Sequence, residues 1–317
     1  MPSPSNRVAF SIMNVDIMWY GLIITIAIGL AVFLAYKRAD RFGIIPEKVL
    51  DYSIFCIPAG LIGARLYYIL FNLDYYSKNL SDIVNIRGGG LAIHGALILG
   101  FLTAFVLSRI WKINTLNALD LGAPSIVIAQ AIGRWGNFFN QEAHGGATDL
   151  PWGILVGGIR VHPTFLYESL WCLAVFVVLL IVSKRRKFNG QIFLLYCILY
   201  SFERFFVEQL RTDSLMLFNI FRQAQVLSAI VFVVGLVAYF YLSRNDNTRA
   251  RSSTASSQES GVRSQNKTLD TNAANGFGEK DSQKNKLIED NTIVRPPVVG
   301  SQESDDGASD SENRIAD

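Results

Sequence analysis

Arginine side chains stand inside or beside several long apolar stretches of this 317-residue chain. Arg65, Arg134 and Arg204 are the most informative of them. A charge at the centre of a bilayer costs about 3 kcal/mol on insertion scales, although a side chain near a helix end lowers that cost by reaching the interface. Planar guanidinium groups recognise phosphates and carboxylates through paired hydrogen bonds. Arginines in such places therefore indicate either an anion-binding site or ion pairs that join helices.

The residues around Arg204 are spaced to share one face of a helix. At 3.6 residues per turn, four polar side chains fall within one stripe. They are Tyr200, Arg204, Glu208 and Arg211. Arg204 and Glu208 also form an i,i+4 pair. The stripe fits a polar network that packs helices, with an intramembrane ion pair, and it equally fits a site that recognises an anion.

The residues around Arg134 form a second polar face. Asn137 and Gln141 recur after it at helical spacing. His94 falls in the first turn of another apolar stretch, after three glycines at 88–90. Glycines allow close backbone approach, and their N–H groups could face a phosphate, although glycines in membrane helices also serve packing. Taken together, the arginines, the histidine, the amides and the glycines favour a site for an anionic headgroup.

Membrane-spanning helices are the elements that must position these residues. The chain is 50% hydrophobic and 17% charged, whereas soluble domains carry about 25% charged residues. A bilayer core needs about 20 mainly apolar residues per helix. Seven stretches meet this length and predict an all-α integral membrane protein with seven transmembrane helices: residues 17–36, 49–71, 91–111, 119–139, 166–183, 191–210 and 224–243. The short loop after 91–111 predicts that this helix and the next form an antiparallel pair.

The distribution of Lys and Arg predicts the orientation of these helices. The loops after the first, third and fifth stretches carry most of the positive charge. Their basic residues are Lys37, Arg38, Arg41 and Lys48, then Arg109 and Lys112, then the run Lys184–Lys187. The positive-inside rule therefore places the N-terminus outside and the C-terminus in the cytoplasm.

With this orientation, five helices bring their polar groups to the outer leaflet. These groups are Tyr20, Arg65, His94, Arg134 and Arg204 with their neighbours. A transporter is the main alternative, because polar residues also line permeation paths. However, the chain shows no internal repeat, and its charges gather at one depth instead of crossing the bilayer. A scaffolding membrane protein would leave this costly cluster unexplained.

The chain divides into three predicted regions. Residues 1–16 form an N-terminal extracytoplasmic segment, and residues 17–243 form the transmembrane domain. Residues 244–317 are rich in Ser, Asn, Asp, Gln, Lys and Glu and contain no Trp or Tyr. Such a segment cannot bury enough apolar surface to offset its chain entropy, so it is predicted to be a disordered cytoplasmic tail.

The loop over residues 140–165 is long enough to form a small extracytoplasmic cap. His162-Pro163-Thr164 at its end predicts the start of a helix. His144 and His162 lack the spacing of metal ligands. The three cysteines, Cys56, Cys172 and Cys197, lie in apolar runs and also lack metal or redox spacing. No metal site is therefore expected.

The polar motifs resemble those of the prolipoprotein diacylglyceryl transferase family. The run Gly133–Glu142, with the sequence GRWGNFFNQE, is similar to the signature of that family. Four further motifs follow the order of the family across residues 17–243, with minor departures such as Phe165, where the family commonly has Gln. They are Gly63–Leu66, Gly89–Gly95, His162–Glu168 and the segment from Glu203-Arg204 through Glu208–Asp213.

The resemblance implies a reaction between a lipid and a protein. Phosphatidylglycerol would be the donor, and the lipobox cysteine in the signal peptide of a prolipoprotein would be the acceptor. The products would be a thioether-linked diacylglyceryl protein and glycerol-1-phosphate, with no cofactor and no nucleic acid involved. Carried over residue by residue, the functional positions of the family fall on Tyr20, His94, Arg134, Asn137, Glu142, Tyr200, Arg204, Glu208 and Arg211.

A mechanism follows as a hypothesis from these positions. Arg134 and Arg204 would hold the phosphate and stabilise charge on the departing glycerol phosphate. His94 is the candidate base for the thiol, because a thiolate is the attacking species. Whether His94 takes this proton or only positions the headgroup stays open. A transferase that uses the same lipid pocket with a different acceptor is a further alternative.

Overall fold

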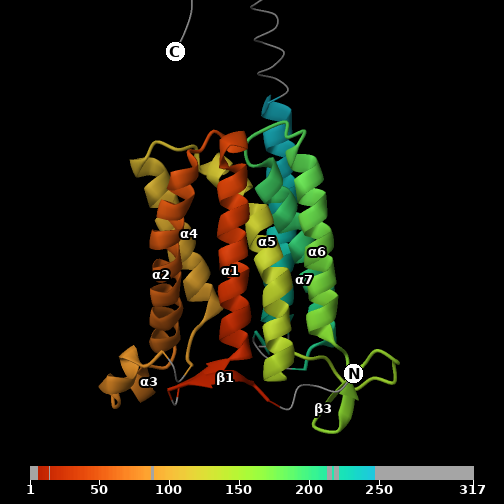
Figure 1. Ribbon diagram of the computed structural model, residues 1–317. Coiled ribbons are helices and arrows are strands. Elements are labelled where there is room, and N and C mark those ends of the chain that lie inside the picture. The colour runs from red at the N-terminus through yellow and green to blue at the C-terminus, as the bar shows by residue number, and fades with distance from the viewer. Residues whose placement is uncertain (1–5, 14, 87–88, 213–215, 218–220, 247–317) are drawn as a thin grey trace, which may run out of the picture. The chain divides into compact units, whose positions relative to one another are not determined.

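The computed structural model describes residues 6–13, 15–86, 89–212, 216–217 and 221–246. Its long helices lie side by side in a bundle (Figure 1). They are α1 (Trp19–Arg38), α2 (Pro46–Leu70), α4 (Ile93–Ile110), α5 (Thr115–Asn140), α6 (Thr164–Ser183), α7 (Gln191–Leu210) and a last helix over Gln223–Asp246. The predicted disordered tail, residues 244–317, lies outside the described residues apart from its first three.

A long helix covers each of the seven predicted apolar stretches. Within the described ranges, six helices are long and apolar enough to cross a membrane. The remaining helix, α7, has sufficient length but carries Glu203, Arg204 and Glu208 near one end. The prediction of an all-α, multi-pass membrane protein is confirmed, whereas the crossing by α7 stays a prediction.

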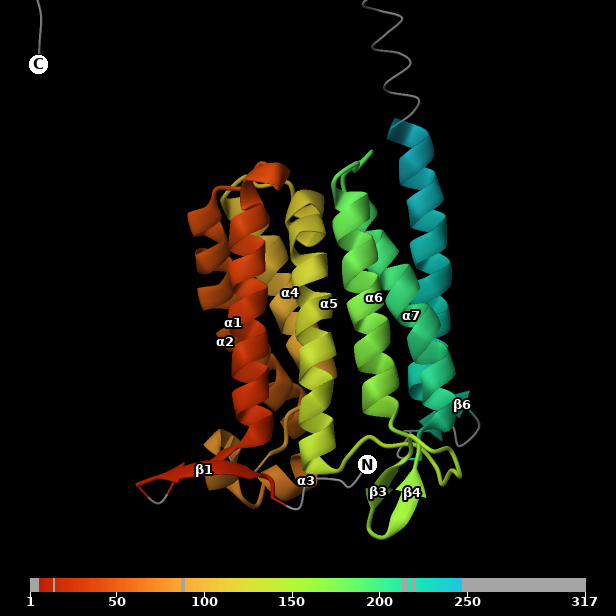
Figure 2. The same ribbon diagram turned by 45° about the vertical axis from the view of Figure 1, so that its right-hand side comes forward.

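Short strands and turns gather at one end of the bundle, which is the lower end in Figures 1 and 2. Each pair of strands is an antiparallel hairpin, and one hairpin falls in the loop for which a small cap was predicted. These elements are β1 (Val8–Ile12) and β2 (Val15–Met18), α3 (Leu73–Tyr76), the 3-10 helix η2 (Leu80–Val84), β3 (Ile154–Val156) and β4 (Ile159–Val161), and β5 (Met216–Leu217) and β6 (Phe221–Arg222). A second 3-10 helix, η1 (Ala39–Phe42), follows α1.

Local sequence signals explain where several helices begin. The side chain of Asn114 accepts hydrogen bonds from the backbone N–H groups of Leu116 and Asn117, at 3.0 and 3.2 Å, and so caps the start of α5. Pro46 is the first residue of α2, a position where the missing N–H costs no helical hydrogen bond. Helix α6 begins directly after Pro163, as predicted from the sequence.

Helices α2 and α4 approach each other more closely than ordinary side chains allow. A Cβ atom on Gly63 would lie 2.4 Å from the carbonyl oxygen of Gly95, and one on Gly95 would lie 2.1 Å from that of Gly63. The two backbones therefore touch, as small residues permit between membrane helices. The predicted pairing of α4 with α5 is wrong in this respect, because α4 packs chiefly on α2 and meets α5 only briefly.

Helix α5 forms the buried centre of the described bundle. It packs on α1, α6 and α7. Its Ala123 and Val127 are fully buried against Cys172 and Leu179 of α6 and Ile192 of α7. A helix in this position can hold polar side chains against two neighbours at once, away from lipid.

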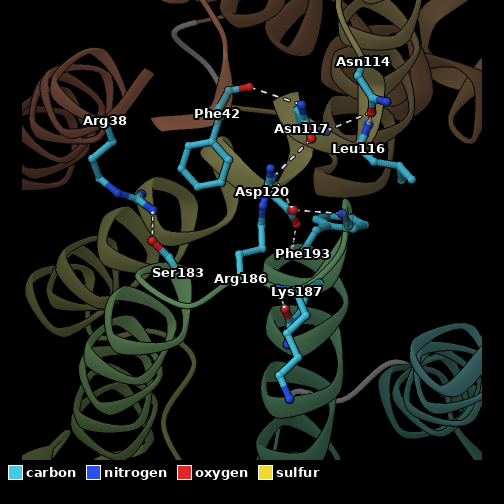
Figure 3. A network of polar contacts seen from close by, with 12 residues as sticks. Arg38, Phe42, Asn114, Leu116, Asn117, Asp120, Ser183, Arg186, Lys187 and Phe193 are labelled. Atoms are coloured by element: carbon cyan, nitrogen blue, oxygen red, sulfur yellow. Dashed lines mark hydrogen bonds and ion pairs between the residues drawn. The ribbon is translucent and has the colours of Figure 1, made fainter. Parts of the chain in front are cut away.

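A polar network fixes α7 on α5 at the end of the bundle that bears the basic loops (Figure 3). The carboxylate of Asp120 in α5 is fully buried. It accepts hydrogen bonds from the backbone N–H groups of Gly190 and Phe193, at 2.8 and 2.9 Å, and from Arg186 at 3.0 Å. Because Gly190 and Phe193 belong to the start of α7, Asp120 caps that helix from a neighbouring one.

Candidate active site

The carboxylate of Glu168, in the second turn of α6, lies among three arginines at the end of the bundle that bears the short strands. Glu168 is only 1% exposed. Arg134 of α5 forms an ion pair with its Oε2 atom. Nη1 of Arg204, in α7, lies 3.5 Å from Oε1, and Nη1 of Arg211 lies 3.9 Å from the same atom. Three helices thus bring the predicted arginines to one buried negative charge.

The contact between α5 and α6 explains the position of Glu168. The hydroxyl of the next residue, Ser169, donates a hydrogen bond to the carbonyl of Ala131 over 2.8 Å. The same hydroxyl accepts a hydrogen bond from Nε1 of Trp135 over 3.1 Å. These two bonds fix the register of α6 on α5 and set Glu168 beside Arg134.

The stripe predicted on α7 faces this cluster. Nη2 of Arg204 lies 2.6 Å from Oε2 of Glu208, so the predicted i,i+4 ion pair is confirmed. Nη2 of Arg134 donates to the hydroxyl of Tyr200 over 3.4 Å. Arg211 is the first residue after α7. The four residues of the stripe therefore all belong to one polar cluster with Arg134.

Glu142 folds back onto the end of α5. Asn137 and Asn140 each donate a side-chain hydrogen bond to Oε1 of Glu142, over 3.0 and 3.2 Å. The chain reverses because Gln141, with φ of 55°, has the left-handed conformation that ends many helices. The expectation that Gln141 continues the helical face of Arg134 is therefore wrong, since α5 ends at Asn140.

Tyr20 joins this region from α1. A Cβ atom on Gly136 would lie 2.7 Å from Cδ2 of Tyr20, so the tyrosine ring rests directly on the backbone of α5. Tyr20 also lies within electrostatic range of Glu142 and Arg134. The glycine in the middle of the signature run therefore makes room for the tyrosine.

Arg65 does not take part in the arginine cluster. Arg65 is only 7% exposed. Its guanidinium group donates to main-chain carbonyls of the segment between α2 and α4. Nε donates to Ile83 over 3.0 Å, Nη1 donates to Gly89 and Gly90 over 2.7 and 2.9 Å, and Nη2 donates to Asp82. Arg65 therefore stabilises the fold of this segment, because its guanidinium nitrogens already donate to the protein's own carbonyls.

A polar cavity of about 490 Å³ lies beside Arg65, between α2, α3 and the loop before α4. Tyr68, Asn72 and Tyr75 contribute to its lining. The hydroxyl of Tyr75 donates to Oδ2 of Asp82 over 2.7 Å, and this bond raises the pKa of Tyr75.

His94 lies in α4, a helix that contributes none of the residues of the arginine cluster. It lies half-buried in the first turn of α4, and its ring centroid is 5.8 Å from that of Tyr67 in α2. Among the described residues it makes no hydrogen bond or ion pair with Arg134 or Arg204. The structure therefore unites eight of the nine predicted site residues in one region and leaves His94 beside it.

Two acidic residues of this region were missed as site residues. Glu168 ends one family motif and Glu203 begins another, but the motifs alone assign a role to neither residue. Glu203 is 6% exposed, and in the described ranges neither of its carboxylate oxygens has a hydrogen-bond partner. A carboxylate inside an apolar helix was the available signal, because membrane helices rarely carry one without a partner or a function.

Comparison with known proteins agrees with the motifs. Residues 7–241 match the family model described as prolipoprotein diacylglyceryl transferase. The chain is 52% identical over 241 residues to a phosphatidylglycerol–prolipoprotein diacylglyceryl transferase of Clostridioides difficile strain 630. This alignment covers 76% of this chain and 97% of the relative. Proteins of the same description from Finegoldia magna and Listeria innocua are 48% and 46% identical over 233 and 256 residues, covering 73% and 76% of this chain and 94% and 92% of each relative.

The matched region contains every residue of the arginine cluster and ends close to the last described residue. The relatives are matched over nearly their whole length, so the similarity extends beyond a shared motif to the helical bundle itself. The resemblance inferred from the sequence is confirmed, and this chain belongs to the prolipoprotein diacylglyceryl transferase family.

Proposed function

We propose that this protein transfers the diacylglyceryl group of phosphatidylglycerol to the thiol of the lipobox cysteine in a prolipoprotein signal peptide. The reaction is the first step of bacterial lipoprotein maturation, at the outer face of the cytoplasmic (inner) membrane. The observation that supports it most directly is the convergence of Arg134, Arg204 and Arg211 on Glu168. Arginines from separate helices, held ready near one membrane depth, suit a phosphodiester headgroup.

Arg204 offers a specific donor for this headgroup. Its Nη2 atom is engaged by Glu208, whereas its buried Nη1 atom lies 3.5 Å from Oε1 of Glu168 and has no hydrogen-bond partner among the described residues. A buried donor without an acceptor costs free energy that a bound phosphate oxygen would recover. Arg134 would hold a second phosphate oxygen, and together the two forks would stabilise the charge that develops on the leaving group.

The chemical step is a displacement at the carbon of the diacylglyceryl group that is bonded to the phosphate oxygen. The thiol loses its proton to a base, and the sulfur forms a bond to that carbon. The bond between this carbon and the phosphate oxygen breaks, and its electron pair leaves with glycerol-1-phosphate. His94 remains our candidate for the base, with the alternative that it only positions the headgroup. All the atoms of the two products come from the two substrates, so the step balances without a further reactant.

The remaining predicted residues would bind and orient the lipid. Asn137 and Glu142 are joined by a hydrogen bond beside Arg134, and Tyr20 packs against the same stretch of α5. In this proposal they would contact the glycerol hydroxyls of the headgroup. Tyr200 and Glu208 would keep Arg134 and Arg204 in their orientation.

The test is direct transfer to a peptide. The purified full-length protein is incubated in vesicles that contain phosphatidylglycerol, with a peptide that carries a lipobox cysteine. We expect the mass of the peptide to rise by one diacylglyceryl group, and a peptide with serine in place of the cysteine to stay unmodified. Modification from another phospholipid alone would indicate a different headgroup transferase. An unmodified cysteine peptide in the presence of phosphatidylglycerol would contradict the proposal.

A further inference from the structure

Glu203 is a buried carboxylate that the mechanism above does not use. Neither of its oxygens has a hydrogen-bond partner within the described part of the chain, and no ion pair joins it to a described residue. It nevertheless lies within electrostatic range of Arg134, Arg204 and Glu168. An ionised carboxylate in apolar surroundings is strongly disfavoured unless hydrogen bonds or a close counter-charge compensate for the lost water.

The charges around Glu203 show what its proton would change. The cluster holds three positive groups, Arg134, Arg204 and Arg211, and two negative ones, Glu168 and Glu208. With Glu203 protonated, Glu203 adds no negative charge beside the arginines that would receive the phosphodiester. With Glu203 ionised, its negative charge would repel a bound phosphodiester, and this repulsion is strong in a site of low dielectric constant.

Other titratable and charged groups lie near Glu203 in the described part of the chain. From α6 it faces Cys172, which is fully buried, and Tyr200 lies one turn away on its own helix. The last helix packs on α7 through Phe232 and Gly235, and its charged residues Arg244 and Asp246 lie in its final turn. At the rim, Nη1 of Arg222 donates to the main-chain carbonyl of Glu208, and Glu142 accepts from Asn137 and Asn140.

We propose that Glu203 is the residue that couples phosphatidylglycerol binding to protonation: the site binds the lipid with Glu203 as a neutral acid and takes up a proton when it starts ionised. The inference rests on the proposed function, since it assumes an anionic phosphodiester on Arg134 and Arg204. Glu203 acts through the arginines and is a positioning residue, not a group that reacts. Because binding then requires a proton on Glu203, the apparent affinity for phosphatidylglycerol falls as the pH rises.

The experiment measures the KM for phosphatidylglycerol between pH 6 and pH 9, with full-length protein in phosphatidylcholine vesicles of varied phosphatidylglycerol content. For the wild-type protein we expect the KM to rise by about tenfold per pH unit once Glu203 ionises in the free enzyme. Glu203→Gln imitates the neutral acid and should keep a low KM that does not vary with pH. Glu203→Asp should restore the dependence on pH. Glu47→Gln, which removes an exposed carboxylate in the first turn of α2, is the matched control and should behave as the wild type.

A second measurement needs no variant. Phosphatidylglycerol vesicles added to the wild-type protein in weak buffer should cause proton uptake, followed with a soluble pH dye, and phosphatidylcholine vesicles should not. A KM that is flat with pH in the wild type, the same slope in Glu203→Gln, or binding without proton uptake would each overturn the inference. These outcomes are distinct from failure of the proposed function, in which the wild-type protein transfers nothing from phosphatidylglycerol at any pH.

Discussion

Glu168 holds the side chains of Arg134, Arg204 and Arg211 in place before any lipid arrives. Without this carboxylate, three guanidinium groups would repel one another in a region with little water. With it, their positions are set in advance, and donors fixed in advance need no reorganisation during the reaction. Glu168 also offsets part of their charge. Recognition of a phosphate therefore depends on the direction of the N–H donors as well as on the positive charge.

The geometry of those donors can be tested with lysine. Arg134→Lys and Arg204→Lys each keep the charge but lose the planar fork. We expect both variants to insert and fold normally, and their transfer rate per folded molecule to fall by about 10²–10³-fold, as when a group that stabilises developing charge is removed. Arg109→Lys, at an exposed arginine in the last turn of α4, is the control and should keep full activity. Near-wild-type turnover in both cluster variants would show that the arginines serve packing alone.

Spacing along one helix was enough to predict the stripe of Tyr200, Arg204 and Glu208, because residues three and four apart face the same side of a helix. The carboxylate that meets this stripe could not be predicted in the same way. Glu168 lies on another helix, and a single sequence does not show which helix faces oppose each other. The absence of a bond between His94 and Arg134 could not be predicted either, since it depends on how α4 packs.

At the level of elements, the existence and length of the helices followed from hydropathy. The stretch predicted at 17–36 is helical at Trp19–Arg38, and that predicted at 191–210 is α7 itself. Which helices pack against each other did not follow from hydropathy. A short loop predicted that α4 pairs with α5, yet direct backbone contact at Gly63 and Gly95 draws α4 to α2. Small residues let the backbones of two membrane helices approach closely. The length of a connecting loop does not reveal such a contact.

Asp120 provides a prediction about how α7 is held. Asp120→Ala would leave Arg186 and the backbone N–H groups of Gly190 and Phe193 without their buried acceptor. Loss of one partner of a buried charge pair costs about 3–5 kcal/mol. We therefore expect a clearly lower midpoint of thermal unfolding in detergent. Asp51→Ala, which breaks only a surface ion pair with Lys48, should change the midpoint little. Equal shifts of the unfolding midpoint in the two variants would show that the cap by Asp120 stabilises the protein no more than a surface ion pair does.

The whole molecule consists of a helical domain and a long polar C-terminal segment. The family match ends at residue 241, and the first compact unit of the chain ends at Ala250. Deletion of residues 251–317 should therefore leave membrane insertion and transfer activity unchanged, measured as product per inserted molecule. A truncated protein that inserts stably but transfers poorly would assign the tail a role in the reaction.

The orientation of the molecule in the membrane decides on which side the lipid is used. Positive charge in the loop Lys184–Lys187 predicts that this loop lies in the cytoplasm and that residues 140–162 lie outside. Cysteines introduced singly at exposed positions, as Asp149→Cys and Lys184→Cys, should react with an impermeant thiol reagent from opposite sides of the membrane. The unsubstituted protein, in which Cys172 is buried and Cys56 and Cys197 are partly exposed, gives the background labelling to subtract. Labelling of both positions from one side would contradict the topology. The arginine cluster lies at the same end of the bundle as Asp149, so labelling of Asp149→Cys from outside would place the reaction in the outer leaflet.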